Sequence, residues 1–168
     1  MSMANGRQTL AESEEATRRR VQHLPLDFPA AHGLLSLYRA ANSVRGALTN
    51  SVLRPHDLTW TGFLVLWTLW IFESMETRDV AESVGISKGT LTGVAKTLVG
   101  RGLVERIPSQ ADRRLVNLRL SPAGEALMEE LYPEFNAVES KIVGDLKAKQ
   151  LQEMTTALRT LVETTERF

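Results

Sequence analysis

Residues 77–98 read TRDVAESVGISKGTLTGVAKTL, and this stretch decides the fold. Its pattern predicts two short helices, at 77–86 and 87–98, that cross at a steep angle around a turn. Gly85 suits the turn because a residue with a Cβ atom loses about 1 kcal/mol or more in the left-handed region. Ala81 is small enough for the crossing, and the apolar residues fall on the shared core face: Val80, Val84, Ile86, Leu91 and Val94. The stretch therefore predicts a helix-turn-helix.

The second of these helices has a face of small and cationic side chains on the side away from the core. Small residues let a helix backbone approach a DNA groove, hydroxyl groups bind phosphates or base edges, and lysines meet phosphate charge. An ordinary solvated face usually mixes Lys with Glu, whereas residues 87–102 contain three basic residues and no acidic one. We therefore expect double-stranded DNA as the partner of seven residues: Ser87, Lys88, Gly89, Thr90, Thr92, Gly93 and Lys96.

A β-hairpin is predicted after the second helix. Strand-like runs at 103–106 and 115–120 flank the polar loop 108–114. The loop carries Asp112, Arg113 and Arg114, which suit either a merely solubilising turn or a wing whose arginine enters the minor groove. Narrow A·T-rich minor grooves concentrate negative potential. In the wing interpretation Asp112 holds one guanidinium in a fixed direction, since Arg–carboxylate pairing is geometrically specific.

The net charge of zero hides a basic middle and an acidic end. Residues 77–121 contain eight Lys or Arg against four Asp or Glu, and residues 122–168 contain five against nine. A local excess of cations is what a polyanion site needs, although an excess of this size is common by chance. The composition is globular, with 43% hydrophobic and 24% charged residues. There is no cysteine, which excludes disulfides, Cys-bound zinc and thiol redox sensing.

Helices are predicted on both sides of this region. Apolar residues step by three or four along 30–52, and the apolar run 58–72 is too short for a membrane span and is typical of a core helix. Asp57 is expected to cap that core helix. Ser121 and Pro122 begin a later helix, in which Pro133 predicts a kink, and a last helix ends the chain.

These motifs resemble the multiple-antibiotic-resistance-regulator (MarR) family of bacterial transcription factors. The match lies in SKGTLTGVAKTL at 87–98, RGLVER at 101–106, ADRR at 111–114 and LRLSPAG at 118–124. The resemblance implies a homodimer with interlocking first and last helices, a winged helix-turn-helix in each subunit, and a pseudo-palindromic operator. By motif position, it implies that Arg114 reaches the minor groove and that Asp112 orients it. Many relatives have an acidic residue and an arginine at the positions of Lys96 and Thr97, so their intrahelical ion pair is absent here.

The expected fold is mainly α with a small β-hairpin wing, in which a winged helix-turn-helix lobe joins a helical dimerisation lobe. Residues 1–28 form an N-terminal arm or a loosely docked helix, and residues 57–121 form the DNA-binding region. The dimerisation region combines 30–53 with 122–168. The apolar stripes of the end helices and the resemblance both favour a homodimer.

The resemblance also implies a pocket for a small aromatic effector. His32, Tyr38, Trp60 and Trp67 lie on the helices that would line it, although tryptophans at this spacing fit a plain core better. The three histidines lack metal-site spacing, so we expect neither a metal nor another cofactor.

The sequence contains no recognisable enzyme motif, such as a Walker-type loop or a dinucleotide fingerprint. The alternatives are a winged-helix protein-interaction module without DNA readout and an enzyme without recognisable motifs. Lys88 and Lys96 argue against the first, since such a module would have an apolar or acidic second helix. The first residues contain no secretory signal. The resemblance implies a ligand-responsive repressor, and we expect it in the bacterial cytoplasm, without membrane association.

Overall fold

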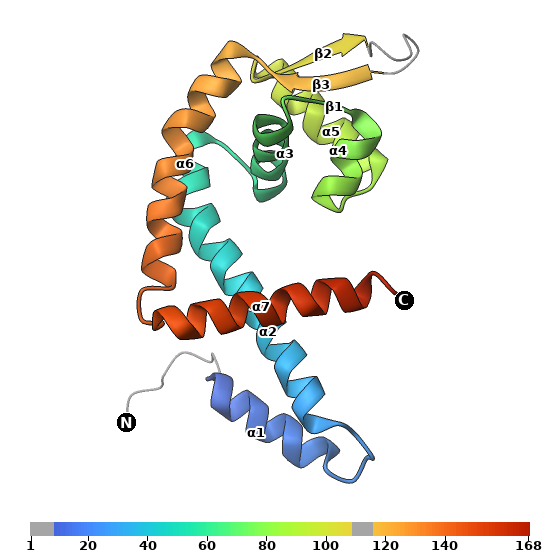
Figure 1. Ribbon diagram of the computed structural model, residues 1–168, viewed down its shortest axis with the longest axis vertical. Coiled ribbons are helices and arrows are strands. Elements are labelled where there is room, and N and C mark those ends of the chain that lie inside the picture. The colour runs from blue at the N-terminus through green and yellow to red at the C-terminus, as the bar shows by residue number, and fades with distance from the viewer. Residues whose placement is uncertain (1–8, 109–115) are drawn as a thin grey trace, which may run out of the picture. The chain divides into compact units, whose positions relative to one another are not determined.

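Helices dominate the computed structural model, which describes residues 9–108 and 116–168 (Figure 1). The chain divides into two compact units, with the boundary between Val44 and Arg45. No helix within the described ranges is long and apolar enough to cross a membrane.

The first unit contains α1 (Leu10–Val21) and most of α2 (Phe28–Leu48). Thr9 caps α1, because its hydroxyl oxygen accepts from the Glu12 backbone N–H at 3.2 Å while the Glu12 carboxylate accepts from the Thr9 N–H at 2.8 Å. These donors, the backbone N–H of Thr9 first and its hydroxyl second, hold the pKa of the Glu12 carboxyl below its usual value. The segment expected as an arm or a loosely docked helix thus contains a capped helix.

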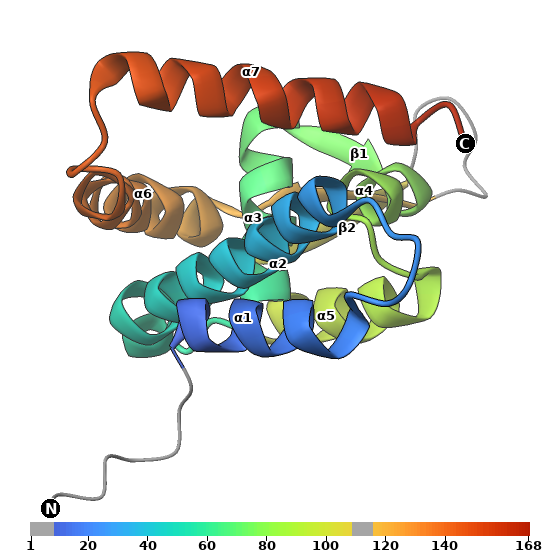
Figure 2. The same cartoon turned by 90° about the horizontal axis from the view of Figure 1, so that it is seen from below.

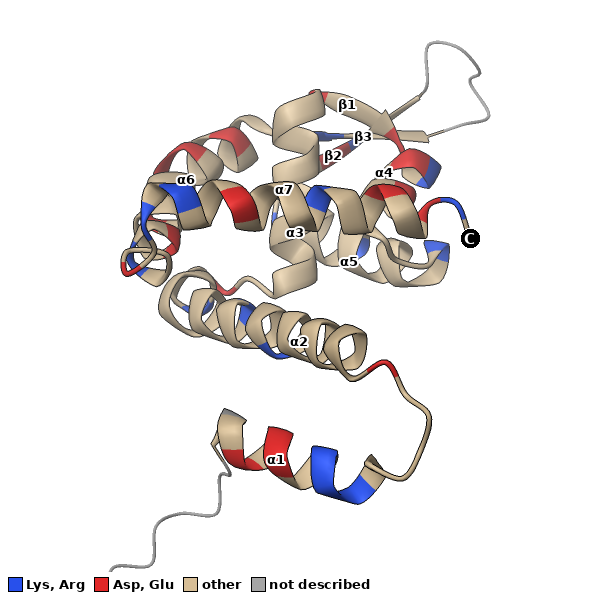
Figure 3. Cartoon of the chain, turned by 60° about the horizontal axis from the view of Figure 1, so that its bottom comes forward, with Lys and Arg blue, Asp and Glu red and all other residues tan. Residues whose placement is uncertain are grey.

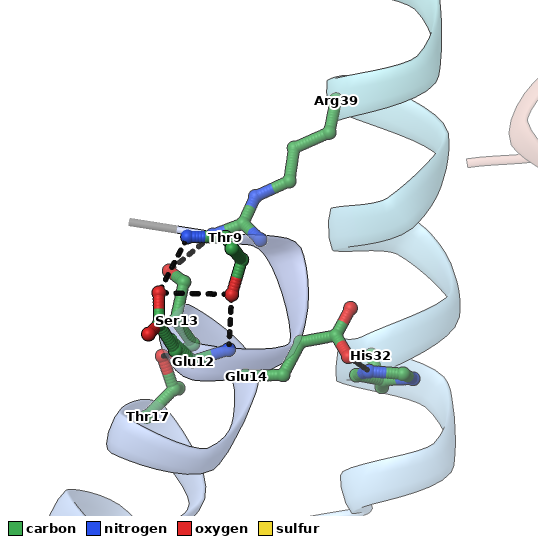
Figure 4. A network of polar contacts seen from close by, with 7 residues as sticks. All are labelled: Thr9, Glu12, Ser13, Glu14, Thr17, His32 and Arg39. Atoms are coloured by element: carbon green, nitrogen blue, oxygen red, sulfur yellow. Dashed lines mark hydrogen bonds and ion pairs between the residues drawn. The ribbon is translucent and has the colours of Figure 1, made fainter. Parts of the chain in front are cut away.

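Two polar contacts join α1 to α2 (Figure 4). The Arg39 guanidinium donates to the Ser13 hydroxyl at 2.6 Å. The His32 imidazole lies 3.0 Å from the Glu14 carboxylate. The first unit is therefore a helical hairpin joined by side chains of both helices.

The second unit begins with the end of α2 and holds every strand found among the described residues. Its further elements are the π-helix η1 (Thr49–Leu53), the 3-10 helix η2 (Arg54–His56), α3 (Trp60–Phe72), β1 (Ser74–Glu76), α4 (Thr77–Val84), α5 (Lys88–Gly100), β2 (Val104–Pro108), β3 (Val116–Leu120), α6 (Pro122–Ile142) and α7 (Ala148–Thr165).

Helix α3 forms the centre of this unit. As expected of the apolar run 58–72, it is a core helix, and it contacts α4, α5, α6 and the sheet (Figures 1 and 2). A helix that is apolar on all sides must be covered on all sides. The N-cap is Thr59, whose hydroxyl accepts from the Gly62 N–H at 3.0 Å. The expectation of Asp57 is wrong, because Asp57 ends η2 in the left-handed conformation, with φ of 52°.

The sheet is antiparallel and has the strand order β1-β3-β2. The predicted hairpin is present as the β2–β3 pair, in which Val104 faces Leu120. Strand β1 was not predicted, because its three residues, Ser-Met-Glu, are too few for an alternating pattern. Strand β1 forms along the other edge of β3, where Ser74 faces Arg119.

Helix α6 is anchored to the base of the hairpin. It begins at N-cap Ser121, as predicted, and continues through Pro133 to Ile142 without interruption. The buried Leu131 and Phe135 hold the helix against the core on both sides of the proline, and the kink at Pro133 stays a prediction. Near its start, a Cβ atom on Gly124 would overlap the backbone carbonyl oxygen of Leu103. Only glycine permits this close approach.

We predict that Gly124→Ala destabilises the fold by about 1–3 kcal/mol, because the added methyl group forces backbone to move apart. Gly100→Ala is the matched control, since a Cβ atom there meets nothing within 4 Å. It should leave stability unchanged or raise it by up to about 1 kcal/mol. Denaturant unfolding at one fixed protein concentration measures both. Equal stability of the two variants would contradict the close packing of α6 against the Leu103 backbone.

Candidate nucleic-acid interface

The turn between α4 and α5 has the geometry of a helix-turn-helix. Gly85 ends α4 with φ of 71° and ψ of 37°, and the N–H of Ile86 donates to the Ala81 carbonyl at 2.9 Å. Ser87 then caps α5, since its hydroxyl accepts from the Thr90 N–H at 3.0 Å. The two predicted helices are confirmed.

The inner face of this motif packs as the sequence predicts, with one addition. Val80, Ala81 and Leu91 are buried, while Val84, Ile86 and Val94 are half-buried. Ala95 is also fully buried, and the sequence analysis did not single it out. Its spacing from Leu91 and Leu98 shows that it belongs to the same helical stripe. This stripe turns one side of α5 toward the core.

The outer face of α5 brings the seven expected residues together, and all seven are exposed: Ser87, Lys88, Gly89, Thr90, Thr92, Gly93 and Lys96. Helix α5 carries basic residues and no acidic residue (Figure 3). Neither of its lysines forms an ion pair with another described residue. The face is therefore a cationic surface with no internal neutralisation along the helix.

The hydroxyl groups on this face are partly engaged already. The Thr92 hydroxyl donates to the Lys88 carbonyl at 2.8 Å, so it keeps only acceptor capacity. The hydroxyls of Ser87 and Thr90 lie 2.8 Å apart, and one donates to the other. This pair therefore has one hydroxyl proton left for an external acceptor. The lysines provide the other outward donors of the face.

Arg101 differs from the two lysines. Its guanidinium donates to the backbone carbonyls of His56 at 2.9 Å and Asp57 at 2.7 Å. One of the three cations counted in 87–102 is thus bound to backbone. Sequence reasoning missed this contact, because its partners lie 44 and 45 positions away.

The hairpin carries a second internally paired cation. Arg119 and Glu105 face each other across β3 and β2, and the Arg119 nitrogens lie 2.8 and 2.9 Å from one Glu105 oxygen. Asp112, Arg113 and Arg114 lie outside the described residues, between the end of β2 and the start of β3.

The expected effector residues are divided between the two units. His32 and Tyr38 lie on α2 in the first unit, where His32 contacts Glu14 and Tyr38 is 67% exposed. Trp60 and Trp67 lie on α3 in the second unit. Both are half-buried, and the Trp60 ring lies 6.2 Å from that of Phe135. Trp60 thus contributes to an aromatic cluster, as the core interpretation predicts.

Comparisons with known proteins agree with this geometry. The sequence pattern of the MarR family matches residues 58–116. Over 166 residues, the chain is 31% identical to the HTH-type transcriptional regulator YwaE of Bacillus subtilis, and the match covers 97% of each chain.

Two solved structures are similar to this one. BpsR of Bordetella bronchiseptica, whose DNA binding is regulated by 6-hydroxynicotinic acid, is 28% identical with a TM-score of 0.69, covering 77% of this chain and 97% of that one. A variant of MarR from E. coli in complex with operator DNA is 22% identical with a TM-score of 0.71, covering 84% and 96%. The second likeness shows a shared fold.

Proposed function

This chain belongs to the MarR family of winged helix-turn-helix transcriptional regulators, a non-enzymatic family, and on that premise we propose that it is a ligand-responsive repressor. In this proposal a homodimer binds a pseudo-palindromic operator in double-stranded DNA. The observation that carries the proposal is the exposed, acid-free outer face of α5.

Helix α5 is the element that enters the major groove in the proposal. Gly89 and Gly93 let its backbone approach the base edges, while Ser87, Thr90 and Thr92 offer short polar side chains. Lys88 and Lys96 meet phosphates, since neither is neutralised within the described chain. At the wing, Arg113 adds a phosphate contact and Arg114 reaches the minor groove, oriented by Asp112.

The helices outside the winged region support a homodimer. None of the 18 residues of α7 is buried, and its apolar side chains include Met154 at 41%, Leu161 at 39% and Val162 at 57% exposure. An 18-residue helix gains little stability from its own backbone in water, so it needs a partner surface. A second copy supplies an equivalent apolar stripe. Two copies of α5 about one helical turn of DNA apart would place the half-sites about 10 bp apart.

An effector enters the proposal as a small aromatic acid. The relative BpsR is regulated in its DNA binding by such an acid, which supports this choice of chemistry. The residues proposed to receive it in the second unit are Trp60 and Trp67, both half-buried on α3. The effector can release the operator only if it binds one dimer geometry more tightly than the other, so its effect equals that difference in affinity.

We predict that operator affinity falls steeply with salt, and that Arg114→Ala weakens binding by about 1–3 kcal/mol without unfolding the protein.

Lys88→Ala should weaken binding to any duplex and reduce the slope of log affinity against log salt by about one. Lys149→Ala on α7, a side chain 85% exposed, is the matched control and should do neither. Footprinting of the DNA next to the protein's own gene first locates the operator. Fluorescence anisotropy with that DNA then measures the affinity of each variant and its dependence on salt. A flat salt dependence, or unchanged binding by Arg114→Ala, would contradict these assignments.

For the dimer, we predict that Leu161→Glu weakens self-association by at least about 2 kcal/mol, because it places an unpaired carboxylate in the apolar contact. Thr156→Glu adds the same charge at an exposed polar position of α7 and should leave the dimer intact. Light scattering at several concentrations distinguishes the dimer from the 18.7 kDa monomer. A parent protein that remains monomeric would refute the proposal.

For the effector, we expect at least one small aromatic acid to lower operator affinity, and Trp67→Ala to reduce that response more than it reduces DNA binding itself. Anisotropy titrations with a panel of hydroxylated benzoic, phenylacetic and nicotinic acids test this. Failure of every acid in the panel to release DNA would refute an aromatic-acid effector.

A further inference from the structure

Arg101, the residue that follows the last helical residue of α5, occupies a junction in the second unit. Its backbone ends α5, where its N–H donates to the Thr97 carbonyl at 3.0 Å. Its side chain extends to the carbonyls of His56 and Asp57, at the end of η2. One residue thus joins the end of α5 to the turn that precedes α3.

The turn presents these carbonyls because of its own backbone. Asp57 has φ of 52° and ψ of 37°, and its N–H donates back to Arg54 at 3.0 Å. The next N–H, of Leu58, donates to Leu53 at 3.0 Å. The carbonyls of His56 and Asp57 are the last ones of this helical stretch. No N–H of a following helical turn is therefore available to donate to them. A guanidinium, with several N–H groups in a fixed plane, can bind both at once.

Apolar packing covers only one side of α5 at this end, where Leu98 is buried but Thr97 and Gly100 are exposed. A groove of about 320 Å³ runs beside the helix, lined by Thr90, Gly93 and Thr97 on one side and by Thr59 and Gly62 on the other. Asp57 and Arg101 also line the groove. Leu98 reaches across and lies 4.0 Å from where a Cβ atom of Gly62 would be. Beyond it, the Arg101 hydrogen bonds are the contacts that join the end of α5 to η2.

The same turn is also connected to α6. The His56 imidazole lies 3.7 Å from the Glu134 carboxylate, and its side chain is 19% exposed. The turn is therefore held on two sides, by α6 through a side chain and by α5 through two carbonyls. The Arg101 hydrogen bonds thus add a polar attachment at the C-terminal end of α5 to the contacts that this helix makes with α3, α4 and β2.

We infer that Arg101 is a positioning residue for DNA recognition, which sets the angle of α5 by fixing its C-terminal end to η2 rather than by touching DNA. This inference rests on the proposed DNA-binding function. It assigns different roles to cations on one helix, since Lys88 and Lys96 meet phosphate and Arg101 holds the helix that carries them.

Salt dependence separates these roles. Arg101→Gln removes the charge and the hydrogen bonds to the two carbonyls. It should weaken operator binding about three- to tenfold and leave the slope of log affinity against log salt unchanged. Arg101→Lys keeps the charge but offers one compact ammonium group, so it should recover only part of the loss. Lys96→Gln is the matched control on the same helix and should reduce the slope by about one. Fluorescence anisotropy of the full chain measures both quantities, with the operator duplex located by footprinting and with a random-sequence duplex.

Amide hydrogen exchange of the free protein gives a readout that does not depend on DNA. Arg101→Gln should speed exchange at the last turn of α5 and at Leu58 about threefold or more, and Lys96→Gln should not. A slope that falls by about one in Arg101→Gln would overturn the inference in favour of a phosphate contact. Unchanged affinity and unchanged exchange would overturn it as well. If the parent protein fails to bind DNA, the proposed function fails, and the exchange comparison still decides whether Arg101 fixes α5.

Discussion

The burial of α3 is the constraint on which the rest of the second unit depends. This helix carries apolar side chains on all sides, so α4, α5, α6 and the sheet must cover it together. Helix α5 contributes the stripe of Leu91, Ala95 and Leu98 to that cover. Once the stripe faces inward, the opposite face must point outward, with Lys88 and Lys96 on it. The position of the candidate DNA surface is thus a consequence of core packing.

The features that the sequence predicted are those set by neighbours within a few residues. The turn at Gly85 and the start of α5 at Ser87 could be predicted, because a left-handed turn and a helix cap impose local chemical requirements. Strand β1 and the Arg101 contacts were not, because each depends on a partner about 40 positions away. A three-residue strand forms only where another strand offers a free edge, and a guanidinium finds carbonyls only after the chain has folded. Such contacts leave no periodic pattern to detect.

Counting charges along the sequence overstates the cations available to a polyanion. Arg119 is paired with Glu105 across the hairpin, and Arg101 is bound to backbone carbonyls. A cation that already has close partners gives up part of those contacts when it binds a phosphate, whereas Lys88 and Lys96 have no ion pair among the described residues to give up. The capacity of the surface to bind phosphate therefore depends on which cations are unpaired. A net charge does not contain this information.

In the second unit, one helix connects the segment that precedes α7 to the base of the hairpin. Helix α6 is continuous over 21 residues, from its buried Gly124 to Ile142, which is 39% exposed. At its start, the Ser121 hydroxyl donates to the Gly102 carbonyl at 2.5 Å, and the Ser121 N–H donates to the Leu103 carbonyl at 3.0 Å. The close approach of Gly124 to Leu103 prevents the helix from sliding there. A displacement at the far end of α6 must therefore move the base of the hairpin or bend the helix, and the buried Leu131 and Phe135 oppose bending.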